Sequence, residues 1–334
     1  MTAPDNALAN LQCRDTAQES LHRAAGEQRD VVFGRKIFVR GVVEVSNYCR
    51  ENCSYCGMRR DNRNLHRYRM ERDALLELVL NQRPASITDI NFQTGEDPVA
   101  VREIIIPVIR EIRRTTHLGI SVCLGTLPDN LYRELHEAGA DFYIIKLETG
   151  NEAHYRQMAS PGNLAERLTA IRHLAATGWN VSSGFILGLP GQDDAMILQT
   201  LELLGTLPLA GCSVSPFIPG NDTLLSSQPT GSLESALNCL AMMRLAHPQW
   251  IIPAVSAMTL LGEGGYARAI QAGANLATIN LTPSAVRDDY LLYTRGRNIM
   301  TEERILREIE NAGCKPSTEG ICTALANKLH CAAA

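Results

Sequence analysis

Short apolar runs alternate along the chain with longer amphipathic stretches. The apolar runs are rich in β-branched residues and stay apolar at their centres, which is typical of strands buried on both faces of a parallel sheet. They predict strands over residues 39–47, 89–95, 120–125, 141–148, 181–189, 212–218, 250–257 and 276–282.

The stretches between these strands have a helical period. In residues 163–178, for example, leucine and isoleucine recur at i, i+4, i+7 and i+10, which places them on one helical face, and Gly178 stands where that helix should end. The same pattern predicts helices over 73–82, 101–115, 130–140, 163–178, 195–207, 233–246, 263–274 and 301–313.

Eight strands alternating with eight helices predict an α/β fold, a (βα)8 TIM-type barrel in a single domain. The alternative is an open doubly wound sheet, which rarely repeats its unit eight times. The prediction divides the chain into an N-terminal helical extension (1–32), the barrel (33–313) and a cysteine-containing C-terminal tail (314–334).

Composition narrows the function classes. The net charge of −4 offers no basic stripe for nucleic acid, and we interpret the one basic run, residues 59–69, as a solvated face near an active-site mouth. No apolar stretch is long enough for a membrane helix, and the N-terminus does not resemble a secretory signal. We therefore expect a cytoplasmic protein with no membrane or nucleic-acid partner, whose ten cysteines stay reduced.

Three of these cysteines form the pattern C-x3-C-x2-C in "NYCRENCSYCGMRRDN" (47–62), at Cys49, Cys53 and Cys56. A disulfide framework would need an even number, and a structural zinc site would need a fourth ligand. The pattern follows the first predicted strand, so a barrel places it at the catalytic face. Three thiolates on a [4Fe–4S] cluster leave one iron free to bind a small molecule.

This stretch resembles the signature of the radical S-adenosylmethionine (SAM) superfamily, and the resemblance extends over about residues 33 to 313. It implies that the open iron of the catalytic [4Fe–4S] cluster holds the amino and carboxylate groups of SAM. One electron, from a donor such as ferredoxin or flavodoxin, then cleaves SAM to methionine and a 5′-deoxyadenosyl radical.

The resemblance also assigns SAM-binding residues at the strand ends. Glu96 of "TGEDP" would receive the SAM ammonium, Arg167 would pair with its carboxylate, and Glu148 would bind the ribose and belong to the catalytic centre with Lys146, which faces substrate. Taken singly, each of these charged residues could equally be in a structural ion pair. The remaining predicted contacts, to the adenine or through close backbone approach, are Tyr55, Gly95, Ile186 and Gly188.

Within the superfamily the chain resembles the biotin synthase/HydE-like branch, and "LGLPGQ" and "PFIPGNDT" look most like HydE. It departs from HydE at Lys146-Leu147-Glu148-Thr149, where HydE carries "RHET". Cys123 matches one ligand of the [2Fe–2S] cluster of biotin synthase, but the other ligands are absent. We therefore interpret Cys123 as a buried strand residue.

The tail carries Cys314, Cys322 and Cys331, which we expect to hold a second Fe–S cluster with His330 or Cys13 as fourth ligand; the alternative is a frayed terminus that contains cysteines. An auxiliary cluster favours sulfur insertion into an acyl chain, as in a lipoyl synthase-type sulfurtransferase of lipoate biosynthesis. Its partners would be a lipoyl-domain carrier protein and a second radical SAM protein. The alternatives are a HydE-type [FeFe]-hydrogenase maturase, a biotin synthase-like enzyme and a non-enzymatic iron–sulfur carrier.

Overall fold

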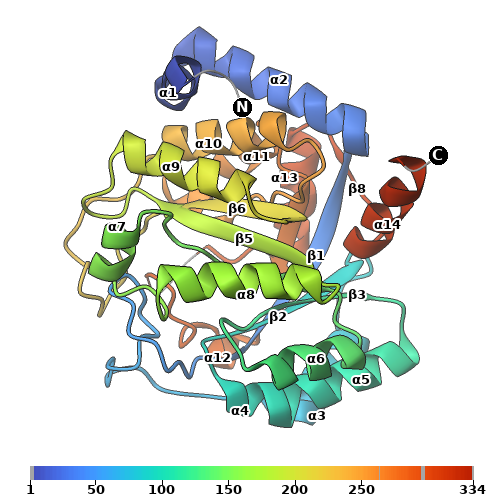
Figure 1. Cartoon of the computed structure of the whole chain (residues 1–334). Helices are drawn as coiled ribbons and strands as arrows, with labels where there is room; N and C mark the ends of the chain where they lie inside the picture. The colour runs from blue at the N-terminus through green and yellow to red at the C-terminus, as the bar shows by residue number, and fades with distance from the viewer. Residues whose placement is uncertain (1–3, 263, 295–297, 333–334) are drawn as a thin grey trace.

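A curved parallel sheet forms the centre of the molecule (Figure 1). The computed structural model describes residues 4–262, 264–294 and 298–332, with side chains over 6–262, 264–294 and 298–326. The sheet path runs β6-β5-β4-β3-β2-β1-β7, and every neighbouring pair is parallel. Its strands are β1 (Lys36–Ser46), β2 (Asp89–Thr94), β3 (Gly119–Cys123), β4 (Phe142–Ile144), β5 (Asn180–Leu187), β6 (Gly211–Pro216) and β7 (Leu276–Asn280).

The predicted strand over 250–257 is wrong as a strand, and the fold is a partial (βα) barrel with seven strands on the sheet path. Ile251 makes one isolated parallel bridge to Gly211 of β6, and Pro253 makes another to Leu276 of β7. Proline has no N–H to donate, so the hydrogen-bond ladder cannot continue through residue 253. A two-residue strand, β8 (Lys315–Pro316), pairs with the beginning of β1.

Helices cover the outer face of the sheet (Figure 1). The predicted helix over 101–115 is a composite, because Pro107 cannot donate to the carbonyl four residues earlier and the turn before it widens to a π-helix over Val101–Ile105. The helices within the sheet region are α3 (Arg72–Leu80), α4 (Pro98–Ala100), α5 (Ile106–Thr115), α6 (Asp129–Ala138), α7 (Glu152–Gln157), α8 (Leu164–Ala176), α9 (Asp194–Gly205), α10 (Leu233–Ala246), the 3₁₀ turn Ser256–Leu260, α11 (Gly265–Gln271), α12 (Ser284–Arg287) and α13 (Glu302–Asn311). None of the helices in the described ranges is long and apolar enough to cross a membrane.

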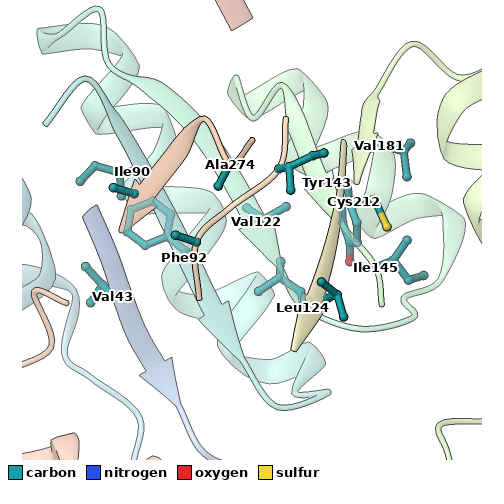
Figure 2. Close-up of a cluster of buried hydrophobic side chains, with 14 of the residues drawn as sticks. Val43, Ile90, Phe92, Val122, Leu124, Tyr143, Ile145, Val181, Cys212 and Ala274 are labelled. Atoms are coloured by element: carbon teal, nitrogen blue, oxygen red, sulfur yellow. The ribbon is translucent and has the colours of Figure 1, made fainter. Parts of the chain in front are cut away.

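The main core lies between the sheet and these helices. Figure 2 shows buried side chains from successive strands, including Val43, Phe92, Val122 and Val181, which point to the same side of the sheet. Burial on this side and in the barrel interior explains why the strands read as continuous apolar runs.

The N-terminal helices α1 (Pro4–Gln12) and α2 (Asp15–Phe33) pack across α10 and α11 (Figure 1). Buried Asn238 of α10 joins them, because its side-chain amide accepts from Gln18 at 2.8 Å and donates to the carbonyl of Leu11 at 3.0 Å. The predicted helical extension thus packs directly on the barrel helices.

The C-terminal helix α14 (Ile321–Ala332) packs beside the amino-terminal ends of the strands. The buried carboxylate of Asp89, at the beginning of β2, accepts from the backbone N of Ile321 at 3.1 Å and 3.2 Å and holds the first turn of α14. Ile321 and Ala324 pack in an apolar cluster with Phe142 of β4 and Leu276 of β7. The tail therefore lies at the end of the sheet opposite the loop that follows β1.

Candidate active site

The residues predicted to bind the cluster and SAM converge at the carboxyl ends of the strands. All but one line a single cavity of about 230 Å³, which we call the outer cavity. They are Cys49, Cys53, Tyr55, Cys56, Gly95, Glu96, Lys146, Glu148, Arg167 and Ile186. Gly188 lies beside it and does not line it; its φ of 86° and a Cβ position 2.5 Å from the Cα of Gly231 explain the need for glycine there.

The three clustered cysteines are free thiols in the loop after β1. A turn joins Cys53 and Cys56, in which the backbone N of Cys56 donates to the carbonyl of Cys53 at 3.2 Å. Nowhere in the described ranges do three His, Cys, Asp or Glu side chains converge as they would on a single metal ion. This arrangement fits a cubane cluster, because the three thiolates of a cubane bind different irons and need not meet at one point.

Burial controls the protonation of these thiols. It raises the pKa of Cys49 and Cys53, and it raises the pKa of Cys56 to about 12. The thiols are therefore protonated at neutral pH without metal, and iron binding must displace their protons.

Arg67 holds the cysteine loop in shape. Its guanidinium donates to the backbone carbonyls of Asn47 at 2.5 Å, Met58 at 2.9 Å and Arg59 at 2.8 Å. The interpretation of residues 59–69 as a solvated face is therefore wrong for Arg67. Arg69 is exposed, and its guanidinium also binds the buried Asp97 carboxylate at 2.7 Å and 3.0 Å. No signal in the sequence distinguishes Arg67 from its exposed neighbours.

Gly95 and Glu96 join β2 to the cysteine loop. A Cβ on residue 95 would lie 2.3 Å from the carbonyl oxygen of Tyr48 and 2.6 Å from the Cβ of Cys49, so only glycine permits this approach. The backbone N of Glu96 lies 3.3 Å from the Cys49 sulfur. Gly95 and Glu96 thus fix the shape of the cysteine loop.

Glu96 and Arg167 form a buried ion pair, with side chains 6% and 3% exposed and an N–O distance of 3.1 Å. The Glu96 carboxylate also accepts from the backbone N of Thr126 at 3.0 Å and from Arg50 at 3.1 Å. Burial opposes the charge of Arg167, but Glu96, Tyr155 and Glu148 together outweigh burial and raise the pKa of the guanidinium. The Nε of Arg167 has no hydrogen-bond partner in the described part of the chain, so one donor of this buried group is available to a ligand.

Glu148 has a backbone conformation that is rare for a residue with a side chain, with φ at 67°. Hydrogen bonds to β5 fix it, because its N donates to the carbonyl of Gly184 at 3.0 Å and its carbonyl accepts from Ile186 at 2.9 Å. Burial raises the pKa of the Glu148 carboxyl, and the nearby Lys146 and Arg167 oppose this shift. The strain aims a carboxylate into the outer cavity beside the cysteines.

A small apolar cluster forms one wall of the outer cavity. Tyr55 of the cysteine loop and Ile186 of β5 pack against Met158, Leu189 and Phe217, separately from the main core. The Tyr55 hydroxyl donates to the Ser160 hydroxyl at 3.4 Å. An apolar wall of this kind suits the face of a planar heterocycle such as adenine.

A second cavity of about 190 Å³, the inner cavity, lies in the barrel interior and adjoins the outer one. Lys146 and Cys123 line both. Cys123 lies on β3, as its interpretation as a strand residue expects, but its side chain is half-buried and lines both cavities. The inner wall is mixed, with polar side chains such as Arg40, Glu44 and Asn91 beside apolar ones such as Val42 and Phe142.

The tail cysteines lie elsewhere. Cys314 belongs to the main core, whereas Cys322 packs against the cluster between α14 and the sheet. The side chains of Cys331 and His330 lie outside the described residues. Since Lys315 pairs with Lys36 at the beginning of β1, Cys314 lies at the opposite end of this 11-residue strand from Cys49. At about 3.3 Å per residue, that separation is on the order of 30 Å.

Comparisons with known proteins agree with this geometry. The model of the Radical SAM superfamily matches residues 43–204. The [FeFe] hydrogenase maturase subunit HydE of Thermotoga maritima is 32% identical over 306 residues, which is 90% of this chain and 88% of that protein. The 3-methylornithine synthase of Methanosarcina barkeri is 26% identical over 325 residues, or 94% and 91% of the two chains. The crystal structure of methylornithine synthase (PylB) superposes with a TM-score of 0.85 at 22% identity over 98% of this chain and 96% of that one, which shows a shared fold.

Proposed function

The chain belongs to the radical SAM superfamily, and on that premise we propose that it performs a reaction of the HydE type, in assembly of the diiron cofactor of [FeFe]-hydrogenase. The observation that carries this proposal is the 32% identity to HydE over 90% of the chain. Membership in the family implies a [4Fe–4S] cluster and SAM as cofactors.

The residues present fit both cofactors. Cys49, Cys53 and Cys56 line one cavity, and three thiolates on a [4Fe–4S] cluster leave one iron open to SAM. The unpartnered Nε of Arg167 can donate to a carboxylate, and the Tyr55–Ile186 wall can cover an adenine. When bound, the reduced cluster supplies the electron that cleaves SAM into methionine and a 5′-deoxyadenosyl radical.

The chain's own residues bind and orient the SAM molecule. Glu96 and Arg167 pair with each other in this structure. In the complex the SAM ammonium would pair with Glu96 and the SAM carboxylate with Arg167, so both side chains already point to the SAM site. Glu148 lines the same cavity as this pair and is placed to accept from ribose hydroxyls.

Lipoyl-type sulfur insertion receives less support than the HydE-type alternative. Neither relative reported above is a lipoyl synthase, and the inner cavity carries Arg40, Glu44 and Lys146, which suit a polar substrate better than an octanoyl chain. A sulfur-donating cluster must also lie beside the substrate, whereas Cys314 lies at the far end of β1. A second cluster in the tail, and the carrier and second radical SAM partners that go with it, stay predictions.

Two measurements test the proposal. Anaerobically reconstituted, dithionite-reduced protein should release 5′-deoxyadenosine from SAM, and it should replace HydE in the maturation of apo-[FeFe]-hydrogenase with the other maturases present. Release of 5′-deoxyadenosine without any hydrogenase activity would reject the maturase reaction and leave the radical SAM chemistry intact. The matched control is the variant Lys146→Arg/Leu147→His, which restores the Arg-His pair of HydE at the position where this chain departs from it.

Iron content tests the tail. The variant with alanine at Cys314, Cys322 and Cys331 should retain the iron of the wild type if the only cluster is the one held by the triad. A fall from about eight irons to about four would establish a second cluster and return sulfur insertion to first place.

A further inference from the structure

Arg40 of β1 is a buried charge that the proposed function does not use. It is 9% exposed and lines the inner cavity, on the same face of the strand as Val42 and Glu44. Its position four residues before Glu44 places it toward the amino-terminal end of the barrel, which is the floor of the cavity. Thr278, its register partner on β7, lines the cavity beside it.

The guanidinium of Arg40 makes no ion pair among the described residues, although the nearby Asp89 carboxylate favours its charge. Its Nη2 donates one long hydrogen bond, 3.4 Å to the Thr278 hydroxyl, and its buried Nε has no partner. Asp89, its register partner on β2, engages its oxygens with the Thr88 hydroxyl at 2.7 Å and the N of Ile321. A buried guanidinium that makes only one long hydrogen bond is costly, because its remaining donors have lost water without gaining a partner.

Other buried arginines show what a structural role looks like. Arg244 donates to the carbonyls of Gly273 at 2.8 Å and Pro248 at 2.7 Å, and Arg29 donates to the carbonyl of Ile270 and to its neighbour Asp30. Each of these two side chains joins segments that are far apart in sequence. Within the described ranges Arg40 makes only the long hydrogen bond to Thr278, so its free Nε points to a ligand.

We propose that Arg40 binds the carboxylate of a small polar substrate that occupies the inner cavity. The free Nε and the weakly bonded Nη2 form one edge of the guanidinium fork, and two parallel N–H donors on one edge match the two oxygens of a carboxylate. The opposite end of the substrate would reach Lys146 and Cys123, where the two cavities join. This inference rests on the proposed radical SAM function, which places the reacting carbon at that junction.

The geometry limits the size of this substrate. Gln93 and Cys123 are register partners, and Gln93 pairs in turn with Glu44, so the junction lies about four residues above Arg40. Four residues rise about 13 Å along a strand, and the arginine side chain itself spans part of that rise. The cavity of about 190 Å³ holds roughly six waters at about 30 Å³ each, which is room for a carboxylate of amino-acid size.

Release of 5′-deoxyadenosine by the reconstituted, reduced holoenzyme gives the first test. The probes are the common L-amino acids and straight-chain dicarboxylates of four to six carbons, each compared with its carboxamide. We expect at least one carboxylate to raise the rate severalfold over the substrate-free rate while its carboxamide does not. Arg40→Gln should abolish this response, and Arg40→Lys should retain part of it.

Thermal stability of the full chain gives a second readout that needs no catalysis. Arg40→Gln removes an unpaired buried charge, so its Tm without ligand should equal or exceed that of the wild type. The matched control Arg29→Gln removes bonds to a carbonyl and should lower Tm while leaving the carboxylate response intact. The stimulating carboxylate should raise the Tm of the wild type and not that of Arg40→Gln, and inorganic phosphate should raise neither.

Three outcomes would overturn the proposal: a lower ligand-free Tm in Arg40→Gln, an equal carboxylate response in Arg40→Gln and the wild type, or no response to any carboxylate. Stabilisation by phosphate alone would also overturn it, since the site would then bind a different anion. If the wild type releases no 5′-deoxyadenosine at all, the proposed function fails instead, and the Tm comparison still decides the role of Arg40.

Discussion

Glu96→Gln and Arg167→Gln should differ in their effect on stability, although they remove opposite halves of one ion pair. In Glu96→Gln the Arg167 guanidinium, 3% exposed, stays buried without its carboxylate partner. Removal of one partner from a buried pair costs about 3–5 kcal/mol, because the remaining charge is uncompensated. In Arg167→Gln the Glu96 carboxylate keeps the N of Thr126 at 3.0 Å and Arg50 at 3.1 Å, so the cost should fall to about 1–3 kcal/mol.

Urea unfolding of the metal-free, SAM-free chain measures this difference as the free energy of unfolding at neutral pH. Arg307→Gln, which breaks the exposed pair between Arg307 and Glu303, is the matched control and should cost less than about 0.5 kcal/mol. The double variant Glu96→Gln/Arg167→Gln should cost less than the sum of the single variants, because it leaves neither charge unpaired. Equal losses in the two single variants, or a larger loss in Arg167→Gln, would refute the reasoning.

Three further changes test the site. Gly95→Ala would place a Cβ 2.3 Å from the Tyr48 carbonyl oxygen and 2.6 Å from the Cβ of Cys49, so reconstituted protein should bind less iron; iron equal to the wild type would contradict the proposed close approach. Cys53→Ala should abolish 5′-deoxyadenosine release, and residual release near the wild-type rate would exclude Cys53 as a cluster ligand. Glu148→Gln should raise Tm at pH 8 and lose this gain toward pH 4. Burial raises the pKa of the Glu148 carboxyl above its usual 4.5, so the folded protein is more stable while this group is protonated at low pH and loses that stability as pH rises. A Tm difference that does not change with pH would argue against this account.

Local patterns predicted the residues that converge at the carboxyl ends of the strands, where we propose that the cluster and SAM bind. Cys49, Cys53 and Cys56 lie within one short loop, and Gly95-Glu96 follows directly on a strand. Residues that are neighbours in the sequence are therefore also neighbours in the site. The parallel strands were predictable for the same reason, since each is one short apolar run. The exception, 250–257, contains a proline whose missing N–H reduces the strand to two bridges.

Features that depend on strand register or loop packing were beyond the sequence. Arg67 points inward to carbonyls of its own loop, and nothing in the run 59–69 distinguishes it from the exposed Arg60. Cys123 reads as an ordinary strand cysteine until the sheet curves and its thiol meets both cavities. Cysteine spacing likewise suggested an Fe–S cluster in the tail. Spacing does not reveal that Cys314 packs in the main hydrophobic core, whereas Cys322 packs against the separate apolar cluster beside α14.

The same distinction explains why the reaction is harder to deduce than the family. The proposed SAM contacts come from motifs at strand ends, where each residue lies beside its neighbours in sequence. Substrate contacts come from inward-facing residues of different strands, and Arg40 meets Thr278 only because β1 and β7 pair in one register. A pair of cations at the two ends of the inner cavity, Arg40 at the floor and Lys146 at the junction, gives this chain a charge pattern that an acyl chain would not need. Specificity should therefore change with substitutions at Arg40 while the radical-generating step, which is held by the loop after β1, stays the same.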